Sequence, residues 1–208
     1  MDKLIKSTES GRIILKRPFK HKVIKNFLDK TEVKLLTDYC RIRHRLNDFS
    51  FDIKPTNNNA DTRIYGDPFT ETLLVQKREI MEKETGYKLL PTYSYWRMYT
   101  YASNLPKHTD RQSCEISVTI SVGSDGTQWP IYLGGTPITL EHGDAAIYFG
   151  CDTLHWREDF KGDWHAQAFL HYVHKDGPFK QFKRDKRLLW GEAPPGNLDN
   201  VLKLNNEN

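Results

Sequence analysis

The spacing of apolar residues changes once along this chain, at Gly86, and this change limits the folds that the chain can adopt. Beyond Gly86, apolar and polar residues alternate within short segments, which is typical of β-strands with one apolar and one polar face. Strands are predicted over 92–101, 115–122, 130–133, 137–141, 145–149 and 165–173, most of them separated by turns that contain glycine. This many short strands favours a sandwich or a jelly roll for the second half of the chain.

Before Gly86 the apolar residues recur at helical intervals, and two helices are predicted there. Asp29 and Glu32 have the spacing of a capping box, so the first helix is expected from about Lys30 to Arg45. The second helix is expected to begin at Asp67-Pro68 and to end at Gly86, which occupies a C-cap position. Helices followed by many strands place the chain in the α+β class.

The composition excludes several classes of protein. Of the 208 residues, 38% are hydrophobic and 12% are aromatic, which is enough to bury a core and unlike a disordered chain. No run reaches the roughly 18 apolar residues of a membrane span, and the N-terminus lacks the apolar region of a secretory signal. Three cysteines without a CxxC pair argue against a disulfide framework, so a reducing, cytoplasmic location is expected.

The length fits one domain over 1–208, with a supporting region over 1–90, a β core over 91–175 and a C-terminal extension over 176–208. Residues 1–26 are rich in Lys and Arg; a solvated strand and loop is favoured there, and a nucleic-acid arm is the alternative. Because the net charge is only +4, neither a nucleic-acid nor a membrane partner is expected. The chain is expected to be a monomer or a homodimer.

Two His-x-Asp triplets occur in the chain, and residues i and i+2 of an extended segment project to the same side, where they can share a metal ion. His142 and Asp144 flank a glycine before an apolar strand, so a tight turn is favoured for this triplet. His108 and Asp110 lie between two predicted strands and are the stronger ligand candidates, with His155 as the expected third ligand. Two imidazoles and one carboxylate on one face of an octahedral ion form the triad of non-haem iron(II) oxygenases.

Five segments of the chain carry a family resemblance in their order and spacing. They are Arg97-Met-Tyr99-Thr-Tyr101, Pro106-Lys-His108-Thr-Asp110-Arg111, Cys114-Glu-Ile-Ser, Gly143-Asp144-Ala-Ala-Ile-Tyr and Leu154-His155-Trp156-Arg157-Glu158. This ordered set resembles an iron(II)- and 2-oxoglutarate-dependent dioxygenase of the prolyl 4-hydroxylase-like group. The resemblance covers about residues 90 to 174, and each segment is common alone whereas the ordered set is specific.

The resemblance implies a double-stranded β-helix (a cupin-like jelly roll) with N-terminal helices packed against one sheet, and iron(II) held by His108, Asp110 and His155. It implies the co-substrates 2-oxoglutarate and O2, with ascorbate as an optional addition, and hydroxylation of a C–H bond with release of succinate and CO2. The implied substrate is a peptidyl proline or another protein or amino-acid side chain. The alternatives are a small-molecule hydroxylase of the same superfamily and a metal-binding cupin-like module without turnover.

The chain departs from the family at the position that binds the far carboxylate of 2-oxoglutarate. Family members have Lys or Arg nine or ten residues after the distal histidine, here His155, whereas this chain has Trp164 and His165 at those positions. A buried carboxylate needs a charged or multiply donating partner. We favour His165 as an imidazolium, which predicts that co-substrate affinity falls as the pH rises through its pKa. Arg97 is the second option, and a different or weakly bound oxo acid is the third. Tyr99 matches a tyrosine that contacts the co-substrate in prolyl 4-hydroxylases, and Thr119 either lines the same pocket or is an ordinary polar strand residue.

The roles of several neighbouring residues have more than one interpretation. Trp156, Arg157 and Glu158 directly follow the third ligand and are expected to meet the substrate or to support the ligands from behind. His171 and His174 are alternatives for the third ligand, although a strand and its exit turn also explain them. The remaining tyrosines of the strand 92–101 are expected in the core rather than on a substrate platform: Tyr93, Tyr95 and Tyr101.

Overall fold

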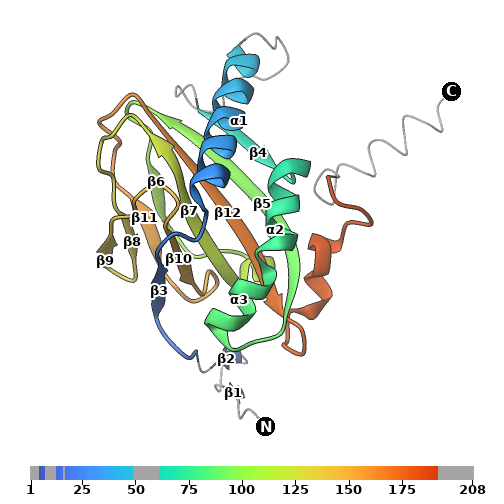
Figure 1. Ribbon diagram of the computed structural model, residues 1–208. Helices are drawn as coiled ribbons and strands as arrows, with labels where there is room; N and C mark the ends of the chain where they lie inside the picture. Colours follow the sequence, from blue (N-terminus) through green and yellow to red (C-terminus); the bar gives the residue numbers. More distant parts are fainter. Residues whose placement is uncertain (1–4, 8–12, 16, 49–60, 192–208) are drawn as a thin grey trace, which may run out of the picture.

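The structure is a computed structural model that describes residues 5–7, 13–15, 17–48 and 61–191. Three α-helices lie in the first half of the chain (Figure 1): α1 (Lys30–Asp48), α2 (Pro68–Gln76) and α3 (Arg78–Thr85). Two short 3-10 helices follow later, η1 (Gln112–Cys114) and η2 (Lys180–Lys186). The strands are β1 (Ile5–Ser7), β2 (Ile13–Leu15), β3 (His21–Ile24), β4 (Thr62–Tyr65), β5 (Leu89–Thr100), β6 (Leu105–His108), β7 (Ile116–Ser124), β8 (Ile131–Leu133), β9 (Thr136–Ile138), β10 (Ala145–Tyr148), β11 (His155–Arg157) and β12 (Trp164–His174).

Two antiparallel sheets form the centre of the molecule. The larger sheet has the strand order β3-β10-β7-β12-β5-β4, and the smaller has the order β6-β11-β8-β9, while β1 and β2 pair apart from both. Every described strand pair is antiparallel. Ile131 and Leu133 of the smaller sheet pack against Ala146 and Tyr148 of the larger one, so the sheets face each other. The predicted α+β class and double-stranded β-helix are confirmed.

The helices cover the outer face of the larger sheet, as predicted (Figure 1). Alternation along β7 sends its isoleucines and valines to this face, where they form the main core with side chains from all three helices. The members that show this best are Ile116, Val118, Ile120 and Val122 of β7, Leu36 and Cys40 of α1, Leu73 and Leu74 of α2, and Met81 of α3. No helix in the described part of the chain is long and apolar enough to cross a membrane.

The predicted helix starts and the end at Gly86 are confirmed, but α1 runs to Asp48, beyond the predicted end at Arg45, and one break was not predicted. The capping box before α1 forms, with the amide of Glu32 donating to Asp29 at 2.8 Å. Asp67 caps the start of α2, and Gly86, with φ of 75°, ends α3. Between them the helix breaks at Lys77, whose ammonium turns inward to pair with Glu32 of α1 at 2.7 Å. Lys77 and Glu32 are far apart in the sequence, so the local pattern of residues could not reveal their pairing. The polar residues around Asn57–Asn59 predict a loop, and they lie outside the described residues.

The inner face of the larger sheet carries a group of buried polar side chains, in contrast to its outer face. Ser117, Thr119 and Ser121 of β7 alternate with the core residues, and all three are buried. The neighbouring strand β12 adds His165 and Gln167, which are buried as well. Buried polar groups need hydrogen-bond partners. This polar wall between the two sheets is therefore a candidate part of a binding site.

The segment after β12, residues 175–191, is fastened to the fold by two ion pairs (Figure 1). Arg187 pairs with Glu71 of α2, and their side chains are only 0% and 1% exposed. Asp185 accepts hydrogen bonds from both terminal nitrogens of Arg111, at 2.7 and 2.6 Å, and one from the hydroxyl of Tyr65 at 2.5 Å. Breaking the fully buried Arg187–Glu71 pair would cost about 3–5 kcal/mol, so this segment is an integral part of the fold.

Candidate active site

Strand pairing in the smaller sheet brings together residues that are far apart along the chain. His155, at the start of β11, lies directly opposite His108, at the end of β6. Asp110 follows His108 by two residues, and its amide donates to the carbonyl oxygen of Gly150 at 2.8 Å, in the loop that leads to β11. The three residues predicted to bind a metal ion therefore meet at one place.

The ligand atoms of these three residues point at one another. Oδ1 of Asp110 lies 3.5 Å from Nε2 of His108 and 3.6 Å from Nε2 of His155. Each imidazole uses its other nitrogen on a backbone carbonyl two residues earlier: Nδ1 of His108 bonds to Pro106 at 2.7 Å, and Nδ1 of His155 bonds to Thr153 at 2.9 Å. These bonds place the proton on Nδ1 and leave Nε2 with its lone pair, which is the arrangement of metal-ligating histidines.

The electrostatics of the group suits a divalent cation. Burial lowers the pKa of His155, so this ring is neutral at pH 7. Burial alone would raise the pKa of Asp110, but the hydrogen bond to His108 and the interactions with the nearby imidazoles hold it below its usual value, so the carboxylate is ionised. The same hydrogen bond raises the pKa of His108. A metal ion among these groups would replace the shared proton, because ligands bind metals in their deprotonated form.

Gly150 allows Asp110 to approach the backbone closely. A Cβ atom at this position would collide with Oδ2 of Asp110 and with the carbonyl oxygen of Cys114, and would lie 2.9 Å from Oγ of Ser117. Oγ of Ser117 is itself 3.5 Å from Oδ2 of Asp110. The backbone at position 150 therefore holds the carboxylate from behind, where there is no room for a side chain.

A second group of potential ligands, Asp110, Cys114 and His171, surrounds the same carboxylate. Nδ1 of His171 is 2.9 Å from Oγ of Ser117, and burial raises the pKa of the Cys114 thiol. A protonated thiol is a poor metal ligand, so the group with two histidines is the better candidate. His174, the other alternative, lies at the end of β12, where its ring packs edge-on against Tyr87.

A cavity of about 410 Å³ opens beside the three ligand candidates. This volume is within the range of small-molecule sites. Arg97 and Arg111 line the cavity, but Arg97 pairs with Asp61 and Arg111 with Asp185. Among the described residues, the wall therefore carries no unpaired arginine or lysine. Aromatic side chains make up much of the rest: Tyr65, Tyr93, Tyr95, Tyr99, Tyr148 and Phe169.

The four residues predicted to contact the co-substrate are all buried, but they do not form one contact set. Tyr99 and Arg97 line the cavity, and the guanidinium of Arg97 lies 4.0 Å from the ring centre of Tyr99. Thr119 and His165 do not line this cavity and are joined through Gln167, although His165 is the cross-strand partner of Tyr99. Nε2 of Gln167 donates to Oγ1 of Thr119 at 2.6 Å, and its Oε1 is 2.8 Å from Nε2 of His165.

His165 is a neutral imidazole in this structure. Burial and the charge of Arg157 lower its pKa to about 3. A neutral ring donates one hydrogen bond but supplies no charge to a carboxylate. This differs from the imidazolium that the sequence favoured, because Arg157 reaches His165 from the other sheet, which local sequence does not show.

The three residues after His155 have different surroundings. Trp156 stacks on Tyr132, with ring centres 4.9 Å apart, and donates to the exposed Glu158 at 2.9 Å. Neither Trp156 nor Glu158 lines the cavity, so contact with a substrate there is not supported. Arg157 is buried, and burial lowers its pKa to about 10, which still leaves the guanidinium charged at pH 7.

The core prediction is confirmed for Tyr93, which is 8% exposed, whereas Tyr95 is half-buried. Tyr93 and Tyr95 line the cavity, and Tyr101 is 65% exposed just beyond the end of β5, so the core prediction for Tyr101 is wrong. Two contributors to the site were not predicted at all. Gln167 is two residues after His165 on β12, and this same-side spacing was its only signal. Asp185 carries no local signal, because its role depends on Arg111, far away in the sequence.

Comparison with known proteins identifies the fold. No protein-family model matches the sequence, and no curated protein matches it either. A prolyl 4-hydroxylase from Pseudomonas putida has 15% sequence identity over 76% of this chain and 94% of that chain, with a TM-score of 0.57. An oxidoreductase of the 2OG-Fe(II) oxygenase family from Burkholderia pseudomallei has 16% identity over 80% and 88%, with a TM-score of 0.55. HygX from Streptomyces hygroscopicus, with nickel and 2-oxoglutarate bound, has 10% identity over 75% and 83%, with a TM-score of 0.57. The chain therefore has the fold of 2-oxoglutarate- and iron(II)-dependent oxygenases.

Proposed function

We propose that this chain is an iron(II)- and 2-oxoglutarate-dependent dioxygenase. One observation carries the proposal: two histidine nitrogens and a carboxylate oxygen lie within 4.8 Å of one another beside a cavity. This is the ligand set of non-haem iron(II) oxygenases, and it leaves three positions of an octahedral ion open. The fold shared with HygX, whose structure holds a metal ion and 2-oxoglutarate, adds independent support.

In this proposal His108, Asp110 and His155 hold iron(II) through Nε2, Oδ1 and Nε2. The carbonyl oxygens of Pro106 and Thr153 keep both rings in the ligating tautomer, and Gly150 keeps the carboxylate in place. When bound, iron(II) with 2-oxoglutarate and O2 supplies the chemistry: the keto acid is oxidised to succinate and CO2, and one oxygen atom enters a C–H bond of the substrate.

The exposure of the ligands indicates the direction from which a substrate enters. The side chain of His108 is 38% exposed, whereas that of His155 is 3% exposed. The site is therefore open on the side of His108 and closed on the side of His155. A closed inner side limits the entry of bulk water, which protects a reactive centre from side reactions.

We propose an uncharged peptide side chain as the substrate, with a peptidyl proline as the first candidate. The aromatic wall, in which Tyr65 and Tyr93 stack with ring centres 4.7 Å apart, suits a proline ring, since aromatic-lined grooves recognise proline-rich peptides. Both wall arginines are neutralised by Asp61 and Asp185, so the described wall does not call for a charged group. The prolyl 4-hydroxylase from P. putida has the same fold, and a free amino acid or another small molecule is the second candidate.

Two measurements test the activity. Addition of iron(II) and 2-oxoglutarate without oxygen should give the visible charge-transfer band of the chelate, and Asp110→Ala should not give it. In air, peptides that contain proline should accelerate succinate release and become one oxygen atom heavier. Matched peptides with alanine in place of proline are the control. Acceleration by small metabolites alone would favour the second class of substrate.

A metal-binding module without turnover is the rival function. Such a module would bind iron(II) with the same three residues, because the ligand geometry does not require catalysis. It would give neither the charge-transfer band with 2-oxoglutarate nor succinate with any substrate. That combination of iron binding without either signal would reject the proposed activity.

A further inference from the structure

Arg157 is a buried cation for which the described residues provide no carboxylate partner. It is 3% exposed. Its NH1 donates to the carbonyl oxygen of Trp129 and its NH2 to Oε1 of Gln167 at 3.2 Å, but its Nε is buried without an acceptor. The guanidinium also lies 4.5 Å from the ring centre of Trp129, which attracts a cation but carries no charge to neutralise it. An unpaired buried charge is costly, so packing alone does not account for this arginine.

The other buried arginines of the described chain are neutralised. Arg97 pairs with Asp61, and Arg187 pairs with Glu71. The fold can therefore place a carboxylate beside a buried guanidinium. Among the buried arginines of the described residues, only Arg157 has no carboxylate partner. A buried cation without a partner is what a binding site for an external anion requires.

Arg157 also sets the direction of a chain of hydrogen bonds. A guanidinium only donates, so the atom of Gln167 that faces it must be the oxygen, and the amide nitrogen must face Thr119. Thr119 therefore accepts a hydrogen bond from Gln167, and its own hydroxyl proton is available to an acceptor between the sheets. His165 must donate from Nε2 to the same oxygen of Gln167, which fixes its tautomer.

Arg157 lies next to the cavity that contains the metal-ligand candidates. It is two residues after His155 on β11, so both side chains project to the same side of the strand. Its charge interacts with the phenols of Tyr99 and Tyr148, which line the cavity, and with the imidazole of His165. Arg157 itself lines a smaller cavity of about 150 Å³, together with His165, whose ring centre is 6.4 Å from that of Tyr99. Tyr99 of the larger cavity and His165 of the smaller one therefore place the two linings next to each other.

We propose that Arg157 supplies the positive charge that binds the distal carboxylate of 2-oxoglutarate, in place of a basic residue nine or ten positions after His155. This inference rests on the proposed function. The hydroxyl of Thr119 is the second donor to the carboxylate, and Gln167 is a positioning residue that orients both donors. Arg97 does not take this role, because Asp61 already neutralises it.

The test compares two keto acids that differ only at the distal end, 2-oxoglutarate and 2-oxopentanoate, which carries a methyl group there. Their dissociation constants are measured without oxygen from the charge-transfer band of the iron(II)-loaded protein, so turnover is not needed. The wild-type protein should prefer 2-oxoglutarate by about 100-fold or more, as expected for hydrogen bonds to a charged group. Arg157→Gln should reduce this preference by at least about 30-fold while the affinity for 2-oxopentanoate stays within about threefold.

Two further variants make the test specific. Lys161→Gln removes an exposed cation four residues away and should leave both dissociation constants unchanged. Arg157→Lys keeps the charge but loses the fork geometry, so it should retain part of the preference. If Arg157→Gln fails to fold, as judged by circular dichroism, a fall of about 10-fold in the preference of Arg157→Lys decides the question.

The possible results separate the two proposals. An unchanged preference in folded, iron-loaded Arg157→Gln would overturn the role of Arg157 and leave the proposed function standing. Loss of the preference in Arg97→Gln but not in Arg157→Gln would also overturn it. Absence of the band in the wild-type protein with either keto acid would instead contradict the proposed function itself.

Discussion

The chain contains two His-x-Asp triplets, and the structure gives them different surroundings. Oδ1 of Asp110 faces two imidazole nitrogens at 3.5 and 3.6 Å. Asp144, in the other triplet, accepts from Nζ of Lys25 at 2.6 Å and from the amides of Asn26 and Glu141, both at 3.1 Å. The carboxylate of Asp110 is open to a metal ion, whereas that of Asp144 is saturated and fixes the chain before α1 to the β core.

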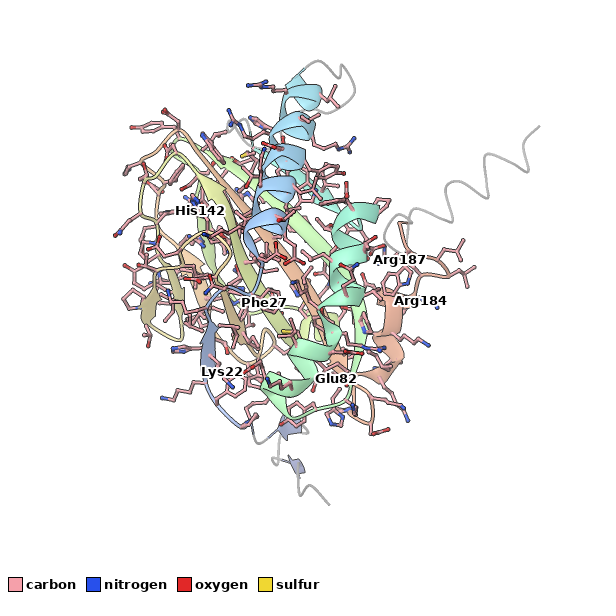
Figure 2. All side chains as sticks on the ribbon, in the orientation of Figure 1. Lys22, Phe27, Glu82, His142, Arg184 and Arg187 are labelled. Atoms are coloured by element: carbon pink, nitrogen blue, oxygen red, sulfur yellow. The ribbon has the colours of Figure 1, made fainter. Side chains whose placement is uncertain are left out.

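A distant residue accounts for this difference. His108 has His155 opposite it across a strand pair, and the three ligand atoms lie together. His142 is exposed, with Nε2 at 3.0 Å from Oγ of Ser124, and within the described residues no group of potential ligands includes it. Figure 2 shows His142 on the opposite side of the molecule from Arg184 and Arg187. A His-x-Asp triplet is therefore a candidate metal site only where a third potential ligand lies beside it.

The largest effect is expected from His108→Ala and Asp110→Ala. Each variant should bind iron(II) at least about 100-fold more weakly, since the loss of an outer partner alone costs 10- to 100-fold. Iron content after gel filtration measures this effect. Asp144→Ala is the matched control and should retain iron. Unchanged iron content in both ligand variants would contradict the assignment.

Asp144→Ala should instead lower the free energy of unfolding, by about 3 kcal/mol, because two backbone amides and Lys25 lose their charged acceptor. Urea denaturation measures this loss. The control is Asp38→Ala, which removes a surface carboxylate paired with Lys34 and should cost less than about 1 kcal/mol. Equal destabilisation by the two variants would show that Asp144 has no special structural role.

Gly150→Ala should weaken iron(II) binding by about 10-fold, because the new methyl group would displace the carboxylate of Asp110. Gly134→Ala is the control: its Cβ would meet open space, and its φ of 58° predicts a loss of about 1 kcal/mol in stability without an effect on iron. Titration with iron(II) and thermal unfolding separate the two outcomes. Similar iron affinities for both variants would argue against the close approach at Gly150.

The smallest effect is expected from His142→Ala. The side chain is exposed and makes one hydrogen bond, so the free energy of unfolding should change by less than about 0.5 kcal/mol. Iron content should equal that of the wild-type protein. A loss of iron in this variant would show that the second triplet also takes part in metal binding, and the contrast between the triplets would no longer hold.

Most of the secondary structure could be predicted because its causes are local. The alternation from Ile116 to Val122 needs only the period of a strand, and the start of α1 needs only Asp29 and Glu32. The break at Lys77 could not be predicted, because its partner Glu32 is 45 residues away. In general, interactions between residues of the same helix or strand could be predicted from the sequence, and interactions between different elements could not.

The site shows the same division. The identity of His108, Asp110 and His155 could be inferred, but their convergence depends on the register of β6 and β11, which no local pattern fixes. The neutral state of His165 depends on burial and on Arg157. The direction of Arg157 could have been inferred from its spacing to His155, whereas its lack of a carboxylate partner is visible only in three dimensions.

The attachment of Asp185 to Arg111 has a practical consequence for anyone who trims the protein for crystallisation or screening. A chain cut before Asp185 would free the guanidinium of Arg111, next to Asp110 in the sequence, and would deprive Tyr65 of its acceptor. The entrance of the pocket would then become cationic, and acidic compounds would bind to it without belonging there. Selectivity measured on such a shortened version would describe the truncation rather than the full-length chain.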